Sequence, residues 1–258
     1  GGNGLITIQW KSSSPDLAIA ANTGNMVRTG YTFTGWNTAA NGTGTHYDTL
    51  QSVALTSSLS LFAEWSANSY AVTFDGNGGS GTMSNLAIVA GTAKTLTANA
   101  FTRTGYTFQG WTTNADGTGT TYTNSQSVTL YSNVTLYAKW LAGTFAVTFG
   151  SNTATGSKLT TNNMPNQSFT AGTPFTLSAN VWYKTGFLFA GWSATNGTST
   201  VIYTDQQQVT LYGATTIYAQ WTPVFVVSYN ANATAGSFTG TVPASANSVD
   251  GAAITVAT

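Results

Sequence analysis

The stretch that decides the fold, residues 103–111, reads Arg103-Thr104-Gly105-Tyr106-Thr107-Phe108-Gln109-Gly110-Trp111. A nearly identical stretch occupies 28–36, and a looser copy occupies 184–192. A second signature, which ends on a tryptophan, follows each copy at 61–65, 136–140 and 217–221. Both signatures recur first after 75 residues and then after 81 residues. Two markers that keep their separation indicate a duplicated unit rather than a recurring short motif.

The duplication divides the chain into modules of about 75 to 80 residues, near the lower limit for an independent hydrophobic core. The predicted modules are 1–67, whose first half is divergent, 68–142 and 143–222. Residues 223–258 match the first half of a fourth module, which makes them a candidate segment for strand exchange.

Each module is predicted to consist of strands. Short runs of alternating, β-branched and aromatic residues recur at 70–74, 145–149 and 225–229, and another such run lies at 5–10. No segment has a convincing helical period, and the high content of Thr, Val, Tyr and Trp is typical of strands. The predicted fold class is therefore mainly β.

Charge is unusually scarce in this chain. Only 5% of residues are Asp, Glu, Lys or Arg, against about 25% in an ordinary globular protein. Seven basic residues balance seven acidic ones, so electrostatic attraction of nucleic acid is not expected. Weak mutual repulsion permits self-association. The chain has no cysteine and no apolar run of membrane-spanning length, and its Thr- and Asn-rich composition suits a bacterial exterior.

The sequence offers no catalytic constellation. His46 is the single histidine, and the matching positions of the other modules hold Thr121 and Ile202. The carboxylates are scattered, so no Ser-His-Asp arrangement and no glycosidase-like pair can be chosen. The loop at 75–79, Asp-Gly-Asn-Gly-Gly, is predicted to be a turn rather than a Ca²⁺ site, because its acidic residue is not repeated. We expect no enzyme activity, no metal and no cofactor.

The glycine and the tryptophans of the signatures are interpreted as structural anchors. A glycine inside a strand often marks a bulge, which would turn the following tryptophan onto the face of the tyrosine and phenylalanine. Sugar stacking by these tryptophans is the less favoured interpretation, because every copy has one at the same place. The predicted anchors are Gly35, Trp36, Trp65, Gly110, Trp111, Trp140, Gly191, Trp192 and Trp221.

The last strand of each module alternates. Leu61, Ala63 and Trp65 share the face predicted to be the core, and Phe62 and Glu64 share the other. The repeat position of Glu64, which holds a lysine and a glutamine in the other copies, is predicted to lie on the surface. The outward aromatics suit glycan stacking, lateral contact between chains or packing between modules. The candidate interaction surface comprises Phe62, Tyr137, Tyr218, Phe225, Val227, Tyr229, Ile254 and Val256.

The units resemble the Listeria–Bacteroides repeat, a family that includes the B-repeat of listerial internalin. The resemblance is carried, in order, by the residues at 72–79, 104–111 and 135–140. It covers 68–222, the second half of 1–67 and, at 223–258, the first half of a module. It implies small β-grasp-like modules arrayed in tandem on bacterial surface proteins as a stalk, spacer or interaction segment, and it carries no catalytic residues over.

The sequence thus predicts an extracellular, cell-surface, non-enzymatic protein built as an elongated array. Residues 223–258 could pair with another subunit's sheet edge, giving a head-to-tail filament, or could mark only a boundary at which the chain was cut. A carbohydrate-binding module or adhesin that uses the outer aromatics is the alternative. Expected partners are copies of the chain itself, head-to-tail or lateral, and a glycan or a host or cell-surface partner; no nucleic acid is expected.

Overall fold

The computed structural model describes residues 16–159, 163–198, 200–228 and 246–249. These residues form strands, turns and irregular segments, and none of them is helical. The predicted mainly β fold class is therefore confirmed. Because the described part of the chain contains no helix, it contains none that could cross a membrane. The strand predicted at 5–10 and the candidate residues Tyr229, Ile254 and Val256 lie outside the described residues.

Contacts along the chain define two compact units, which we describe separately. The first comprises Gly1–Thr102 and Gln109–Lys139, and the second comprises Arg103–Phe108 and Trp140–Thr258. The division falls inside the signature stretch, between Phe108 and Gln109. The two halves of that stretch therefore belong to different packing environments.

The first unit begins with a small antiparallel sheet. Strand β2 (Tyr31–Asn37) is its middle strand, between β3 (His46–Tyr47) and β5 (Phe62–Ala67). A separate pair joins β1 (Leu17–Ala18) to β4 (Ser52–Val53). Of these, β2 and β5 match the predicted strands, whereas β1 and β3 are two-residue segments too short for a periodic signal.

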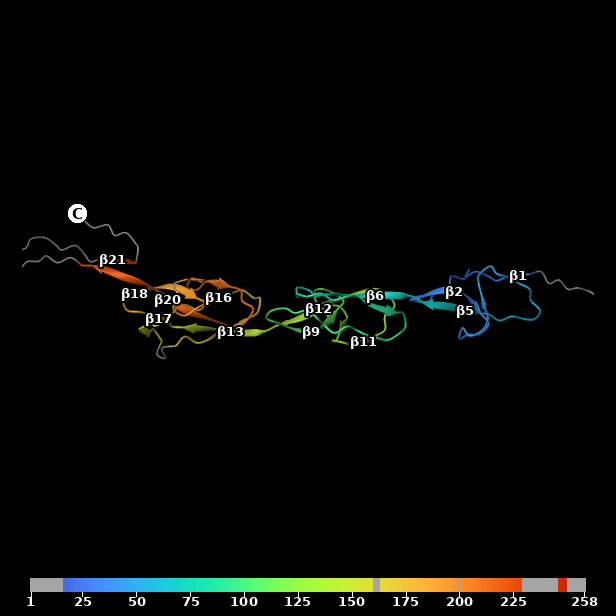
Figure 1. Ribbon diagram of the computed structural model, residues 1–258, viewed down its shortest axis with the longest axis horizontal. Coiled ribbons are helices and arrows are strands. Elements are labelled where there is room, and N and C mark those ends of the chain that lie inside the picture. Colours follow the sequence, from blue (N-terminus) through green and yellow to red (C-terminus); the bar gives the residue numbers. More distant parts are fainter. Residues whose placement is uncertain (1–15, 160–162, 199, 229–245, 250–258) are drawn as a thin grey trace, which may run out of the picture. The chain divides into compact units, whose positions relative to one another are not determined.

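The next sheet has the order β10-β9-β12-β6-β7; its strands β6, β9 and β12 are labelled in Figure 1. Strand β6 (Ser69–Asp75) runs parallel to β12 (Val134–Ala142), with Val72 opposite Val134, and antiparallel to β7 (Leu86–Val89). Strand β9 (Tyr106–Thr112) pairs with β10 (Thr121–Tyr122), and β8 (Lys94–Thr95) pairs with β11 (Ser127–Val128). As the alternation predicted, Val72 and Phe74 of β6 are buried, and so are Leu136 and Ala138 of β12.

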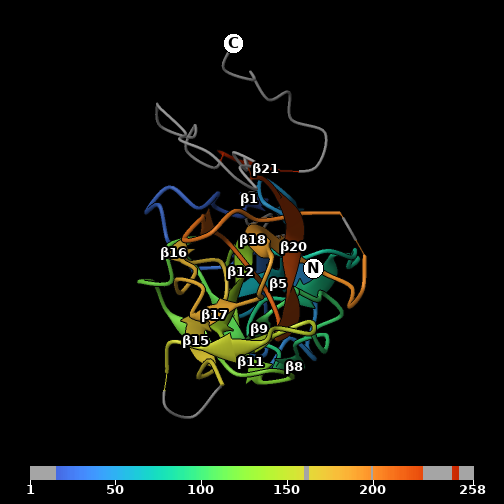
Figure 2. The same cartoon turned by 90° about the vertical axis from the view of Figure 1, so that its left-hand side faces the viewer.

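The second unit repeats this plan with the order β15-β13-β20-β18. Strand β13 (Thr144–Gly150) is parallel to β20 (Thr215–Val227) and antiparallel to β15 (Gln167–Thr170). Strand β18 (Phe187–Ser193) pairs with β20, the long strand that crosses Figure 2 vertically. The short pairs are β14 (Gly156–Ser157) with β17 (Trp182–Tyr183), and β16 (Phe175–Thr176) with β19 (Gln208–Val209).

Strand β20 serves two copies of the repeat. Its first part is the last strand of the third module, and its final residues pair with β21 (Ala246–Val249). Phe225 faces Ser248 there, in the register in which Tyr70 of β6 faces Ile88 of β7. The fourth copy thus starts with the same antiparallel pair. The β-grasp-like detail of the modules remains a prediction.

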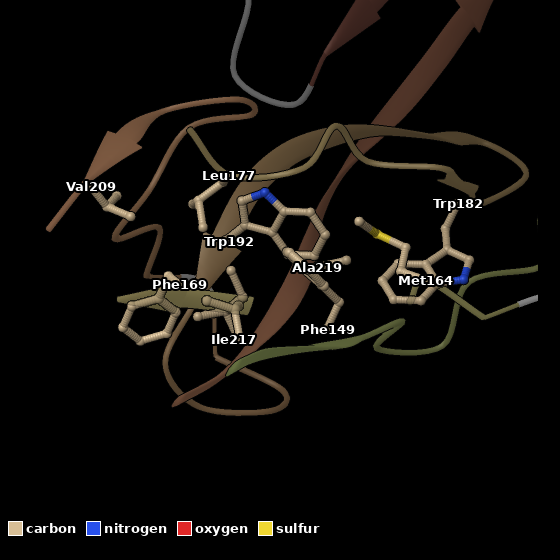
Figure 3. Packing of buried hydrophobic residues seen from close by; sticks show 10 residues of the cluster. Phe149, Met164, Phe169, Leu177, Trp182, Trp192, Val209, Ile217 and Ala219 are labelled. Atoms are coloured by element: carbon tan, nitrogen blue, oxygen red, sulfur yellow. The ribbon is translucent and has the colours of Figure 1, made fainter. Parts of the chain in front are cut away.

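Trp192 occupies the centre of the hydrophobic core in the second unit. Its ring lies 5.0 Å from that of Phe149, 5.0 Å from that of Phe189 and 6.2 Å from that of Trp182, measured between centroids. Figure 3 shows Leu177 beside the indole, Ile217 and Ala219 near it, and Met164 and Trp182 together on one side. Aromatic pairs of this geometry contribute about 0.5–1.5 kcal/mol each beyond the burial of apolar area.

Candidate functional site

The second half of each signature, Gly-Trp, builds the interior of its own module. Gly35, Gly110 and Gly191 have φ angles of 145°, 131° and 139°. The pairing register shifts between Phe33 and Gly35 and again between Phe189 and Gly191, so the predicted bulge is present in both strands. A Cβ at Gly110 would lie 2.6 Å from the carbonyl oxygen of Tyr122, which leaves no room for another residue.

The bulge decides where the tryptophan points. Residues three apart in a regular strand lie on opposite faces. Yet the rings of Phe33 and Trp36 meet edge to face at 5.4 Å, because the extra residue turns Trp36 onto the face of Phe33. Trp111 and Trp192 are fully buried, and Trp36 is half-buried. Full burial of the first two indoles supports packing as their role and leaves them no face for a sugar.

The tryptophan of the second signature packs against the phenylalanine of the first. Trp65 meets Phe33 at 5.5 Å, and Trp221 meets Phe189 at 5.7 Å, both edge to face. In the second unit, Trp140 meets Phe108 in the same way at 5.6 Å. These three tryptophans are half-buried. Each ring pair therefore joins the strand of the first signature to the strand of the second.

The first half of the signature, Gly-Tyr, makes contacts with the following module. The hydroxyl of Tyr31 donates to the carbonyl oxygen of Ala90 at 3.3 Å. Asn68 is the single residue between β5 and β6. Its backbone N–H donates to the carbonyl oxygen of Gly30 at 2.9 Å, and its carbonyl oxygen accepts a hydrogen bond from the backbone N–H of Ala90 at 2.9 Å. The guanidinium of Arg28 stacks 3.8 Å above the Tyr31 ring. Sequence reasoning assigned this tyrosine only to the face that it shares with the phenylalanine, because a tyrosine in an alternating strand gives no sign of a contact with the next module.

The second unit repeats the arrangement. The hydroxyl of Tyr106 donates to the carbonyl oxygen of Ala171 at 3.2 Å. The backbone N–H of Gly143 donates to the carbonyl oxygen of Gly105 at 2.8 Å, and the carbonyl oxygen of Gly143 accepts a hydrogen bond from the backbone N–H of Ala171 at 2.9 Å. Arg103 stacks 4.1 Å above the Tyr106 ring. The same set of bonds therefore occurs twice, at equivalent positions of the repeat.

The outward aromatics differ in exposure from one module to the next. Phe62 is 45% exposed and Phe225 is 56% exposed, whereas Tyr137 and Tyr218 are half-buried. The Tyr218 ring lies over Gly150, where a Cβ would collide with it. Val227 lies in β20 opposite Ala246, and its side chain is outside the described set. The predicted interaction surface is thus uneven among the residues that the structure describes.

A cluster around His46 was not predicted. Its Nδ1 lies 2.8 Å from Oε2 of Glu64, and its Nε2 lies 3.2 Å from Oδ1 of Asp48. The hydrogen bond to Glu64, and then that to Asp48, raises the pKa of His46 above its ordinary value. The hydrogen bond from His46, and then that from Asn37 at 3.1 Å, lowers the pKa of Glu64. Asp48 is 2 residues from His46 in the sequence, but Glu64 is 18 residues away. Nothing in the sequence therefore indicated that the two carboxylates meet at one imidazole.

A polar pocket of about 330 Å³ opens beside this cluster and is lined by Arg28, Asn37, Glu64 and Trp65 among others. Among the described residues, no group of three or more His, Asp and Glu side chains has an arrangement able to hold a metal ion. The cluster is therefore a hydrogen-bonded, titratable feature of the first module.

One expectation about the surface is wrong. The repeat position shared by Glu64, Lys139 and Gln220 was predicted to be exposed, but Gln220 is only 5% exposed. Its Nε2 donates to the hydroxyl of Ser193 at 2.7 Å. A neutral amide with a hydrogen-bond partner tolerates burial, whereas the charged amine of Lys139 stays exposed.

The fold and these contacts define a class of protein: a tandem-repeat β protein whose signature strand serves both a module core and the contact with the next module. The family model of the Listeria-Bacteroides repeat domain matches residues 8–64, 70–139 and 145–220. The chain belongs to this family, which confirms the resemblance inferred from the sequence.

Relatives of known name share part of the chain. The putative Gly-rich membrane protein of Evansella cellulosilytica is 36% identical over 149 residues, which cover 54% of this chain and 17% of that protein. A putative membrane protein of the same organism is 36% identical over 90 residues, covering 33% of this chain and 14% of its own length. Internalin H of Listeria monocytogenes is 35% identical over 113 residues, which cover 43% of this chain and 19% of internalin H. The chain thus spans less than a fifth of each of these relatives. No solved structure matches it.

Proposed function

We propose that this chain is a non-enzymatic segment of a bacterial surface protein, in which tandem modules form a stalk or spacer. The observation that carries the proposal is the absence of a linker where consecutive modules join within the described units. Only Asn68 separates β5 from β6, only Gly143 separates β12 from β13, and β20 continues through the equivalent position. A flexible linker would need a longer polar or glycine-rich stretch. The names of the relatives, two membrane proteins and an internalin, support the surface assignment.

Small-angle X-ray scattering tests the spacer function. Deleting 68–142 removes one whole period and leaves the repeat in phase. We expect the maximum dimension of the chain to fall by about the length of one module. An unchanged maximum dimension would show that the modules fold back on one another, and the spacer function would be abandoned.

Protease treatment of intact cells tests the surface assignment. In the bacterium that makes the protein, we expect peptides from the exposed turn residues 41–44 and 114–116 to be released without lysis. Release only after lysis would contradict a surface location. A cytoplasmic marker protein serves as the control.

A finer proposal concerns self-assembly through 223–258. Strand β6 is paired on both sides, by β7 and by β12, whereas among the described residues Phe225–Val227 of β20 pair with β21 alone. A strand from another copy could add to the second side and produce head-to-tail filaments. Size-exclusion chromatography should then show oligomers that disappear when 223–258 is deleted. A monomer with and without this segment would remove the filament proposal.

Carbohydrate binding is the second candidate, and the exposure of Phe62 at the surface of the first module favours it. An exposed aromatic face can stack on a sugar ring. Binding on a glycan array should then disappear in Phe62→Ala, Tyr137→Ala and Tyr218→Ala, and persist in the control Leu141→Ala, which alters another exposed apolar residue. Failure to bind any glycan would eliminate this candidate.

A further inference from the structure

The contacts made by the Gly-Tyr half of the signature form a defined interface, which we call the tyrosine clasp. Its first part is a strand end, Gly30-Tyr31. Its second part is a socket on the next module, formed by Ala90, Gly91 and Tyr131. In the second unit the strand end is Gly105-Tyr106, and the socket is Ala171, Gly172 and Tyr212.

Both sockets use a glycine to make room for the incoming tyrosine. A Cβ on Gly91 would collide with the hydroxyl of Tyr31, and a Cβ on Gly172 would collide with that of Tyr106. The two glycines also share a φ of 72°. The hydroxyl thus lies directly over the turn and reaches the carbonyl oxygen of the preceding alanine.

The socket tyrosine also packs against the glycine of the strand end. A Cβ on Gly30 would lie 2.9 Å from the Tyr131 ring, and one on Gly105 would collide with the carbonyl oxygen of Tyr212. Both glycines have a φ of 80°. Tyr131 and Tyr212 are 45% and 49% exposed, so neither belongs to the buried core of its module.

The sequence varies at the clasp while the surrounding fold is kept. Thr56 occupies the socket position in the first module, and Phe187 occupies the strand-end position in the third. Phe187 has no hydroxyl to donate, although Val224 still donates its backbone N–H to Gly186 at 2.8 Å. The tyrosines are therefore dispensable for the module itself, since a module folds with phenylalanine there.

We propose that the tyrosine clasp is an interaction surface that fixes each module against the next module of the same chain. Its partner is a strand end that carries glycine followed by tyrosine. A strand end with phenylalanine, as in the third copy, holds its neighbour less firmly. The inference concerns only the joint, so it stands apart from whether the array is a surface stalk.

Spin-label distance measurement on the full chain tests the clasp between the first module and the part of the second module that lies in the same compact unit, Gly1–Thr102 and Gln109–Lys139. The sequence has no cysteine, so Ser58→Cys and Ser84→Cys, at two exposed positions, place one label on each module. We expect a single narrow distance distribution. Gly91→Ala should broaden or shift it, because the added Cβ displaces Tyr31.

Gly117→Ala is the matched control. Gly117 has a comparable φ of 81°, but its added Cβ would meet nothing closer than Lys139 at 3.9 Å. This variant should keep the narrow distribution. Tyr31→Phe removes only the hydroxyl and should broaden the distribution less than Gly91→Ala.

Hydrogen exchange of β9 and β12 shows whether the second module is still folded in each variant. If Gly91→Ala unfolds that module, only the distance distribution of Tyr31→Phe tests the clasp, because this variant removes a hydroxyl without adding an atom to the socket. A distribution as narrow and at the same distance as in the parent, in folded Tyr31→Phe, would overturn the proposal. So would equal broadening in Gly91→Ala and Gly117→Ala.

Discussion

The side-chain amide of Asn77 donates a hydrogen bond to the carbonyl oxygen of Ala138, 61 residues further along the chain, at 3.0 Å. It also donates to the carbonyl oxygen of Ala115 at 2.8 Å. Asn152 makes the equivalent bond to Ala219 at 2.8 Å. Both asparagines are left-handed, with φ of 47° and 42°, a conformation that asparagine tolerates better than most residues. In the second and third modules, the loop after the first strand is therefore tied to the parallel strand by an asparagine.

Replacing Asn77 should destabilise the second module. Asn77→Ala removes two hydrogen bonds and places a Cβ-only residue at positive φ, which we expect to cost about 1–3 kcal/mol of unfolding free energy. Asn77→Gly restores the backbone freedom but not the bonds, so it should lose less. The free energy of opening, from hydrogen exchange of β12, measures both. If Asn77→Gly matches the parent protein, the amide contributes nothing.

Gly110 is predicted to be irreplaceable within its strand. Gly110→Ala forces a Cβ to within 2.6 Å of the Tyr122 carbonyl oxygen at a φ of 131°. Strain of this kind costs about 1–3 kcal/mol, and the collision adds to it. Denaturant unfolding should show a lower midpoint for Gly110→Ala than for Gly117→Ala, which has positive φ but an open surrounding. Equal midpoints would mean that the strand accommodates the bulge without glycine.

Much of this fold could be predicted because the repeat supplies internal comparison. The positions of β2, β6 and β9 follow from alternating residues, and the glycine before each tryptophan indicated the bulge. The two-residue strands could not be predicted, because two residues define no period. The parallel pairing of β6 with β12 joins residues about 60 positions apart. Neither segment contains a sequence signal that identifies the other as its pairing partner.

The site was harder to predict than the fold. Tyr31 and Phe33 alternate as core residues do, but only the structure shows that the Tyr31 hydroxyl reaches Ala90. Gln220 occupies the position of two charged residues, and its buried amide donates hydrogen bonds to the Ser193 hydroxyl and the Tyr218 carbonyl oxygen. His46 was set aside because no other copy has a histidine, although a feature of one module need not be repeated. All three residues were hard to predict for the same reason: each has a polar atom whose hydrogen-bond partner is distant in the sequence.

The tryptophans of the first signature should differ in their importance for stability. Trp192 is fully buried among aromatic rings, so Trp192→Ala should cost about 3–5 kcal/mol of unfolding free energy. Trp36 occupies the same repeat position but is half-buried, so Trp36→Ala should cost less. Hydrogen exchange resolved by module provides the comparison. Equal costs in the first and third modules would contradict the difference in burial.

The His46 cluster predicts a pH dependence confined to the first module. A raised pKa of His46, above 6.5, means that its contribution to stability is complete below pH 6.5 and is lost as the pH rises through the raised value. A lowered pKa of Glu64, below 4.5, means that its contribution is present above pH 4.5 and is lost as the pH falls through the lowered value. The pair is therefore most favourable between pH 4.5 and 6.5.

Proton NMR measures this directly, because His46 is the only histidine and gives one imidazole titration curve. We expect a midpoint above 6.5 in the parent chain and a lower midpoint in Glu64→Gln, which introduces the residue of the third module at this position. Asp48→Asn should lower the midpoint less, because its contact at 3.2 Å is longer than the 2.8 Å contact of Glu64. His46→Thr, the residue of the second module, should remove the loss of stability of the first module above neutral pH. A midpoint unchanged by Glu64→Gln would show that the 2.8 Å contact does not form in solution.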